Sequence, residues 1–89
     1  MPNANAYLTV SVHAEWPVQG CDEETGNLLL RPGFVDQLEK DAQLEPGAIS
    51  EEIFNAFMAG WYSQRRRAGY PEDPAMERFV VKKLGWSRR

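Results

Sequence analysis

Three consecutive arginines, Arg65, Arg66 and Arg67, are the side chains in this sequence best suited to hold an anion or a charged partner. Guanidinium groups bind phosphates and carboxylates through a planar fork of donors. Tyr62 and Tyr70 flank the triplet in the sequence, and aromatic rings of this kind stack on bases and other planar groups. We therefore treat these five residues as candidate partner-binding residues.

The triplet also suits the end of a helix, which provides a purely structural alternative. Successive residues of an α-helix are about 100° apart, so the three side chains would fan out. Arg65 shares the aromatic side and should lay its alkyl stem along it. Cations at a helix C-terminus contribute typically ~0.3–1 kcal/mol each. Both interpretations remain open, and a nucleic-acid surface would need Lys82 and Lys83 to lie nearby in space.

Carboxylates form the second group of candidate partner-binding residues: Asp22, Glu23, Glu24, Glu51 and Glu52. By charge complementarity such side chains could occupy a basic groove meant for nucleic acid. The net charge of −3 divides into −8 for residues 1–62 and +5 for residues 63–89. This asymmetry indicates either a charged partner for one segment or a basic C-terminal third that folds against the acidic body.

No residues are arranged for catalysis or metal binding. His13 shares a predicted strand face with Ser11 and Glu15, but same-face neighbours along a strand are at least ~6–7 Å apart, too far for a triad. Cys21 precedes three acids, which should raise the pKa of its thiol. One Cys and one His cannot complete a zinc site. We expect neither an enzyme nor a protein with a cofactor or a metal.

The elements that must position these residues can be predicted from periodicity. Residues 7–16 alternate apolar and polar side chains, which predicts a half-buried strand that ends at Pro17. An acidic loop over 19–27 and a short apolar run, 28–30, complete a hairpin. The strand is longer than its partner, so part of its edge should be unpaired and could pair with another chain.

Three helices should follow. Apolar residues at helical spacing predict a helix over 34–42. Ser50 is a good N-cap for a helix to about Ala68, where Gly69 suits the left-handed C′ position. Asp73 and Pro74 predict the start of a third helix. The expected fold is a small α+β domain, residues 1–89, with an N-terminal antiparallel hairpin packed against helices in the order β-β-α-α-α.

The second predicted helix has two contrasting faces. Phe54, Phe57 and Trp61 share a broad aromatic face of the kind that packs into a core. Ala56 and Gly60 lie on another side, and a glycine inside a helix often marks close approach by another backbone. The second contact is expected to be an internal helix, with a partner chain as the alternative.

Composition sets the remaining limits. A hydrophobic fraction of 43% over 89 residues suits one folded domain. No apolar run reaches the ~20 residues needed to span a bilayer, and the N-terminus does not resemble a secretion signal. A single cysteine suits a reducing compartment. We therefore expect a cytoplasmic protein with no membrane segment, as a monomer or a homodimer.

The stretch IFNAFMAGWYSQRRRAGYP resembles a helix with basic residues after it in short uncharacterised proteins of tailed bacteriophages. This class includes anti-CRISPR and other anti-defence inhibitors that bind host proteins. The resemblance implies a protein that binds by surface contact. Together with the acidic body and the absence of a reaction centre, it leads to the hypothesis of a phage-encoded, non-enzymatic inhibitor that acts in the host cytoplasm and blocks a nucleic-acid-handling or CRISPR-type complex. The alternative hypothesis is a small nucleic-acid-binding module that uses the basic C-terminal third.

Overall fold

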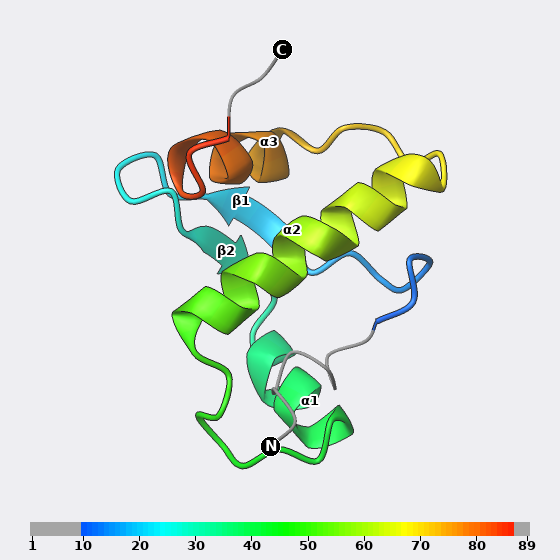
Figure 1. The fold of residues 1–89 in the computed structure, drawn as a ribbon, viewed down its shortest axis with the longest axis vertical. Coiled ribbons are helices and arrows are strands. Elements are labelled where there is room, and N and C mark those ends of the chain that lie inside the picture. Colours follow the sequence, from blue (N-terminus) through cyan, green and yellow to red (C-terminus); the bar gives the residue numbers. More distant parts are fainter. Residues whose placement is uncertain (1–9, 87–89) are drawn as a thin grey trace.

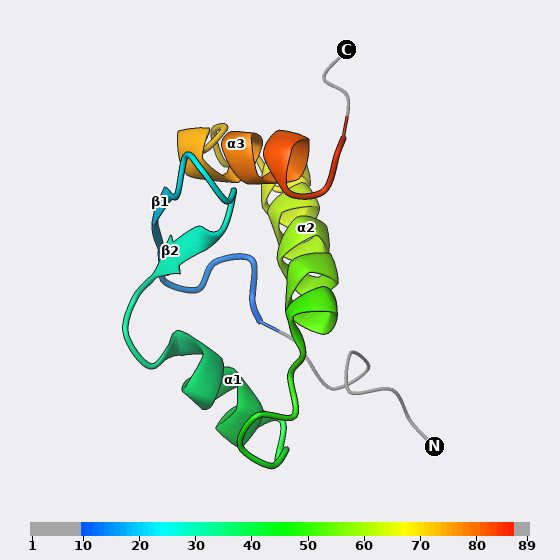
Figure 2. The same cartoon turned by 90° about the vertical axis from the view of Figure 1, so that its left-hand side faces the viewer.

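Two short strands are followed by three helices in a computed structural model that describes residues 10–86 (Figure 1). Strands β1 (Val18–Cys21) and β2 (Leu28–Leu30) form an antiparallel hairpin. Helices α1 (Phe34–Asp41), α2 (Glu51–Arg67) and α3 (Pro74–Lys82) complete the β-β-α-α-α order. Figures 1 and 2 place α1 and α3 at opposite ends of the molecule, with the hairpin and α2 between them. The predicted α+β fold is confirmed.

The predicted first strand is wrong in position. Residues 7–9 lie outside the described residues, and residues 10–16 form an irregular segment with a turn instead of a strand. Burial nevertheless alternates here as predicted: Val12, Ala14 and Trp16 are half-buried, whereas His13 and Glu15 are exposed. The alternation therefore predicts correctly which side chains face the core, although the backbone does not form a strand.

Hydrogen bonds to α2 explain why this segment is not a strand. Trp61 Nε1 donates to the carbonyl of Ser11 at 3.2 Å, and Arg65 Nη1 donates to the carbonyls of Val12 at 2.6 Å and Ala14 at 3.2 Å. These side chains satisfy backbone acceptors that a neighbouring strand would otherwise satisfy. The hairpin consequently begins only after Pro17.

The main helix, α2, begins and ends as predicted. The Ser50 side chain accepts a hydrogen bond from the backbone N–H of Ile53 at 3.2 Å, and Gly69 adopts the left-handed conformation with φ 100°. One side of the helix is buried in the core through Phe57, Met58 and Trp61. This helix is therefore the element against which the N-terminal segment packs, whereas the hairpin packs against α3.

The other two helices complete the same core. Asp73 caps α3 by accepting from the N–H of Met76 at 3.1 Å, and Phe79 and Val80 of α3 are buried. In α1, the buried carboxylate of Glu39 accepts from the N–H groups of Gly47 at 2.8 Å and Ile49 at 3.2 Å. Glu39 thus fixes the loop that leads into α2.

Candidate functional site

The three arginines diverge from one another, and Arg65 serves the fold. Its guanidinium lies 4.5 Å from the ring centre of Trp16 and 4.0 Å from that of Tyr70, while it donates to two carbonyls of the N-terminal segment. Arg66 donates to the carbonyl of Tyr70 and lies 3.8 Å from the carboxylate of Glu72. Arg67 alone of the triplet is exposed without an ion pair to another described residue. The triplet is therefore not a single anion-binding patch.

The two tyrosines proposed for partner binding are also engaged inside the molecule. Tyr62 is only 6% exposed, donates to Glu77 and accepts from the backbone N–H of Asp73 at 3.1 Å. Burial, reinforced by the hydrogen bond to Glu77, raises the pKa of Tyr62 to about 12. Tyr70 stacks under Arg65, and its hydroxyl lies 2.9 Å from Nδ1 of His13. Tyr62 is thus a core residue, which corrects its placement among the surface candidates.

The lysines lie far from the arginine triplet, whereas a nucleic-acid surface would need the lysines and the arginines close together. Lys83 forms an ion pair of 2.6 Å with Glu51, in the first turn of α2. Arg65 lies fourteen residues further along the helix, about 20 Å at 1.5 Å per residue. Lys82 donates to the carbonyl of Glu23 in the hairpin loop. The basic C-terminal third thus folds against acidic segments, one of the two arrangements expected from the charge distribution.

Two acidic segments meet at the C-terminal end of α3. The hairpin loop and the start of α2, distant in sequence, each contact one of its lysines. Within the loop, Asp22 Oδ1 accepts from the N–H groups of Glu24 at 2.8 Å and Thr25 at 3.2 Å, so Asp22 shapes the turn. The carboxylates of Glu23 and Glu24 are exposed, and Glu52 has no ion pair to another described residue.

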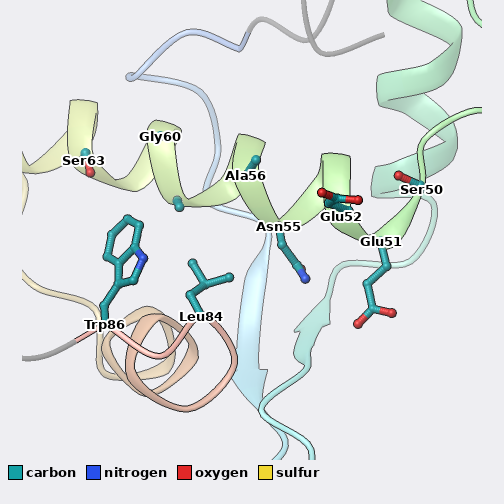
Figure 3. Close-up of a pocket in the computed structure, with 10 residues that line it drawn as sticks. Ser50, Glu51, Glu52, Asn55, Ala56, Gly60, Ser63, Leu84 and Trp86 are labelled. Carbon is teal, nitrogen blue, oxygen red and sulfur yellow. The ribbon is translucent and has the colours of Figure 1, made fainter. Parts of the chain in front are cut away.

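A groove of about 930 Å³ runs along the small-residue face of α2 (Figure 3). Ala56, Gly60 and Ser63 form its floor, and Leu84 and Trp86 project toward them from the segment after α3. A Cβ atom added at Gly60 would meet nothing within 4 Å. The internal helix expected against this face is therefore not present among residues 10–86, and the face is open.

Trp86 lines this groove, although it is not among the partner-binding residues predicted from the sequence. Its side chain is 48% exposed, although it is large and aromatic. Its backbone N–H donates to the carbonyl of Val80 at 2.9 Å, and Gly85, with φ 71°, turns the chain back toward α2. The sequence does show a glycine after the third predicted helix, followed by Trp86. The direction in which the Trp86 ring points, however, depends on tertiary structure.

Within residues 10–86, no group of three or more His, Cys, Asp or Glu side chains is placed to hold a metal ion. Burial is the main cause that raises the pKa of the Cys21 thiol; the charge of Arg78 opposes it and that of Asp22 adds to it. No helix in this part of the chain is long and apolar enough to cross a membrane.

No protein family, curated protein or solved structure matches the chain.

Proposed function

We propose that this protein is a non-enzymatic protein-binding domain and that the groove on α2 is its contact site. The observation that carries the proposal is the exposed Trp86 beside a helix face made of small residues. Tryptophan is enriched among residues that dominate binding energy, and a large exposed ring beside an open apolar groove is typical of interaction surfaces. Small side chains at Ala56 and Gly60 let another backbone approach closely.

The groove favours an α-helix with a basic side chain at one end. Its floor follows α2, and a helix laid along another helix packs at an axial separation of about 8–10 Å. Glu51 and Glu52 line one end of the groove, and Glu51 is already paired with Lys83. Glu52 is thus available to a cation of the bound helix. Nucleic acid fits this site less well, because its backbone would meet carboxylates.

In its narrower form, the proposal is that binding inhibits a host nucleic-acid-handling or CRISPR-type defence complex. Its support is the resemblance to phage proteins, together with the exposed carboxylates of the hairpin loop, Glu23 and Glu24. Expression in a CRISPR-immune host, with phage plaques as the readout, tests this form. The protein should restore plating, and replacement of Asp22, Glu23 and Glu24 by lysine should abolish the effect. Unchanged inhibition would remove this loop from the interface.

The general proposal is tested by filling the groove. Gly60→Gln adds a side chain to an open floor position and should leave the fold intact. Asp36→Asn, on the exposed side of α1, is the matched control outside the groove. Tagged wild-type protein and the control should capture the same proteins from a bacterial lysate, and Gly60→Gln should lose them. Equal capture by all three proteins would contradict the proposed site.

A further inference from the structure

We infer that the helix bound in the groove is α2 of a second copy of this chain, packed antiparallel about a two-fold axis between Ala59 and Gly60. The inference rests on the proposed function, because it requires the groove to be a protein-binding site. It identifies the partner, which the groove alone does not. The evidence is the order of side chains along the exposed stripe of α2.

This stripe is acidic at its start, small in its middle and basic at its end. At about 100° per residue, its five members fall within about 80° on one side of the helix: Glu52, Ala56, Gly60, Ser63 and Arg67. Four of the five are exposed, and Ser63 is half-buried. Neither charged residue has an ion pair to another described residue. Both charges are therefore available to a second molecule.

An antiparallel copy makes this stripe complementary to itself. Glu52 and Arg67 each lie about 11 Å along the axis from the midpoint between Ala59 and Gly60. The two-fold axis therefore places Glu52 of each copy opposite Arg67 of the other, and Ala56 opposite Ser63. A parallel arrangement would set Glu52 against Glu52 and would be disfavoured by like charge. The charges thus select both the direction and the register.

The shape of the groove suits such a pair. Small residues at the crossing point allow close approach of the two helices, and nothing within 4 Å of the missing Gly60 Cβ blocks it. Leu84 and Trp86 lie beside α2 and would contact the incoming helix. Two-fold symmetry supplies a second wall from the other copy, as in an isologous interface. The hairpin-loop carboxylates do not line the groove, so the dimer would still present them.

A charge-swap experiment tests the register by sedimentation equilibrium. Wild-type protein should form dimers. Glu52→Arg sets two arginines against each other at each end of the pair, and Arg67→Glu sets two glutamates there, so each variant should dimerise roughly tenfold more weakly. An equimolar mixture of the two variants pairs opposite charges at both ends and should recover dimers. The double variant, Glu52→Arg with Arg67→Glu, should recover them alone. Circular dichroism checks that each variant is folded.

Several outcomes would overturn the inference. Wild-type protein that stays monomeric into the millimolar range excludes the second copy. Dimers that persist unchanged in Gly60→Gln use another surface, and a mixture that fails to recover dimers excludes the antiparallel register. The proposed function is judged separately: if wild-type protein is monomeric but lysate capture is still lost in Gly60→Gln, the groove remains a protein-binding site and its partner is a different protein. Recovery in the mixture and in the double variant, with loss in Gly60→Gln, supports the inference.

Discussion

The two sides of α2 differ in the size of their side chains and in their burial. One side carries Phe57 and Trp61, is buried, and holds the N-terminal segment through Trp61 and Arg65. The other carries Ala56 and Gly60, is open, and borders a half-exposed tryptophan. The contrast teaches that the most conspicuous residues, the arginines and tyrosines, mainly serve the fold. The least conspicuous ones form the open surface that we propose as the contact site for a partner.

The largest effect is expected from removing an aromatic ring on the buried side. Trp61 is 3% exposed, packs against Trp16 and Phe57, and holds the carbonyl of Ser11. Trp61→Ala should lower the free energy of unfolding by about 3–5 kcal/mol, because it leaves a cavity and an unpaired carbonyl. Urea unfolding measures the change. A decrease in unfolding free energy of less than about 1 kcal/mol would contradict the claim that this side of α2 packs in the core.

A pH effect should follow from Tyr62, which also lies on the buried side. The folded pKa of about 12 exceeds the ordinary value of 10, so the folded state holds the phenol proton more tightly. The resulting stability is fully present below pH 10 and is lost as the pH rises toward 12, a loss of about 2–3 kcal/mol. Tyr62→Phe should flatten this part of the stability profile. Identical slopes for the two proteins would contradict the assignment.

An intermediate effect is expected at Arg65. Arg65→Met retains an apolar stem but removes two hydrogen bonds to carbonyls and the contacts with Trp16 and Tyr70. The cost in unfolding free energy should be about 2 kcal/mol. Arg67→Met, the matched control two residues further on, should stay within about 0.5 kcal/mol. Equal costs for the two variants would mean that the triplet does not divide into structural and exposed members.

The smallest effect should have the opposite sign. Gly60 lies inside α2, and an added Cβ meets no atom within 4 Å. Gly60→Ala should therefore raise the free energy of unfolding by about 0.5–1 kcal/mol, because alanine restricts the unfolded chain and favours helix. Thermal unfolding at low protein concentration measures the change. Destabilisation would show that this face is packed within the monomer.

Local signals in the sequence predicted the helices well, since capping depends on neighbours. Ser50, Gly69 and Asp73 each occupy the predicted capping role. The first strand could not be placed, because alternation over 7–16 predicts which side chains face the core and does not predict which groups donate hydrogen bonds to the backbone carbonyls. Its acceptors are satisfied by Trp61 and Arg65, about fifty residues away.

The candidate site was only half predictable for the same reason. The small residues Ala56 and Gly60 were visible as a helix face, but the sequence alone favoured an internal contact for them. Leu84 and Trp86 form the wall of the groove only because the chain turns back after α3. The nucleic-acid alternative required Lys83 near the arginines, but Lys83 pairs with Glu51 at the other end of α2. The open helix face, the groove wall and the position of Lys83 all depend on packing between segments that are distant in the sequence.

Photo-crosslinking from position 86 tests most directly the claim that the open side of α2 is a protein-contact surface. Replacement of Trp86 by p-benzoylphenylalanine exchanges one aromatic ring for another at the groove wall. The control is the same replacement at Leu29, which is 53% exposed on β2 and lies outside the groove. We predict a discrete protein adduct from position 86, of dimer size if the second copy binds, and none from position 29. No adduct from position 86, or the same adducts from both positions, would contradict the account.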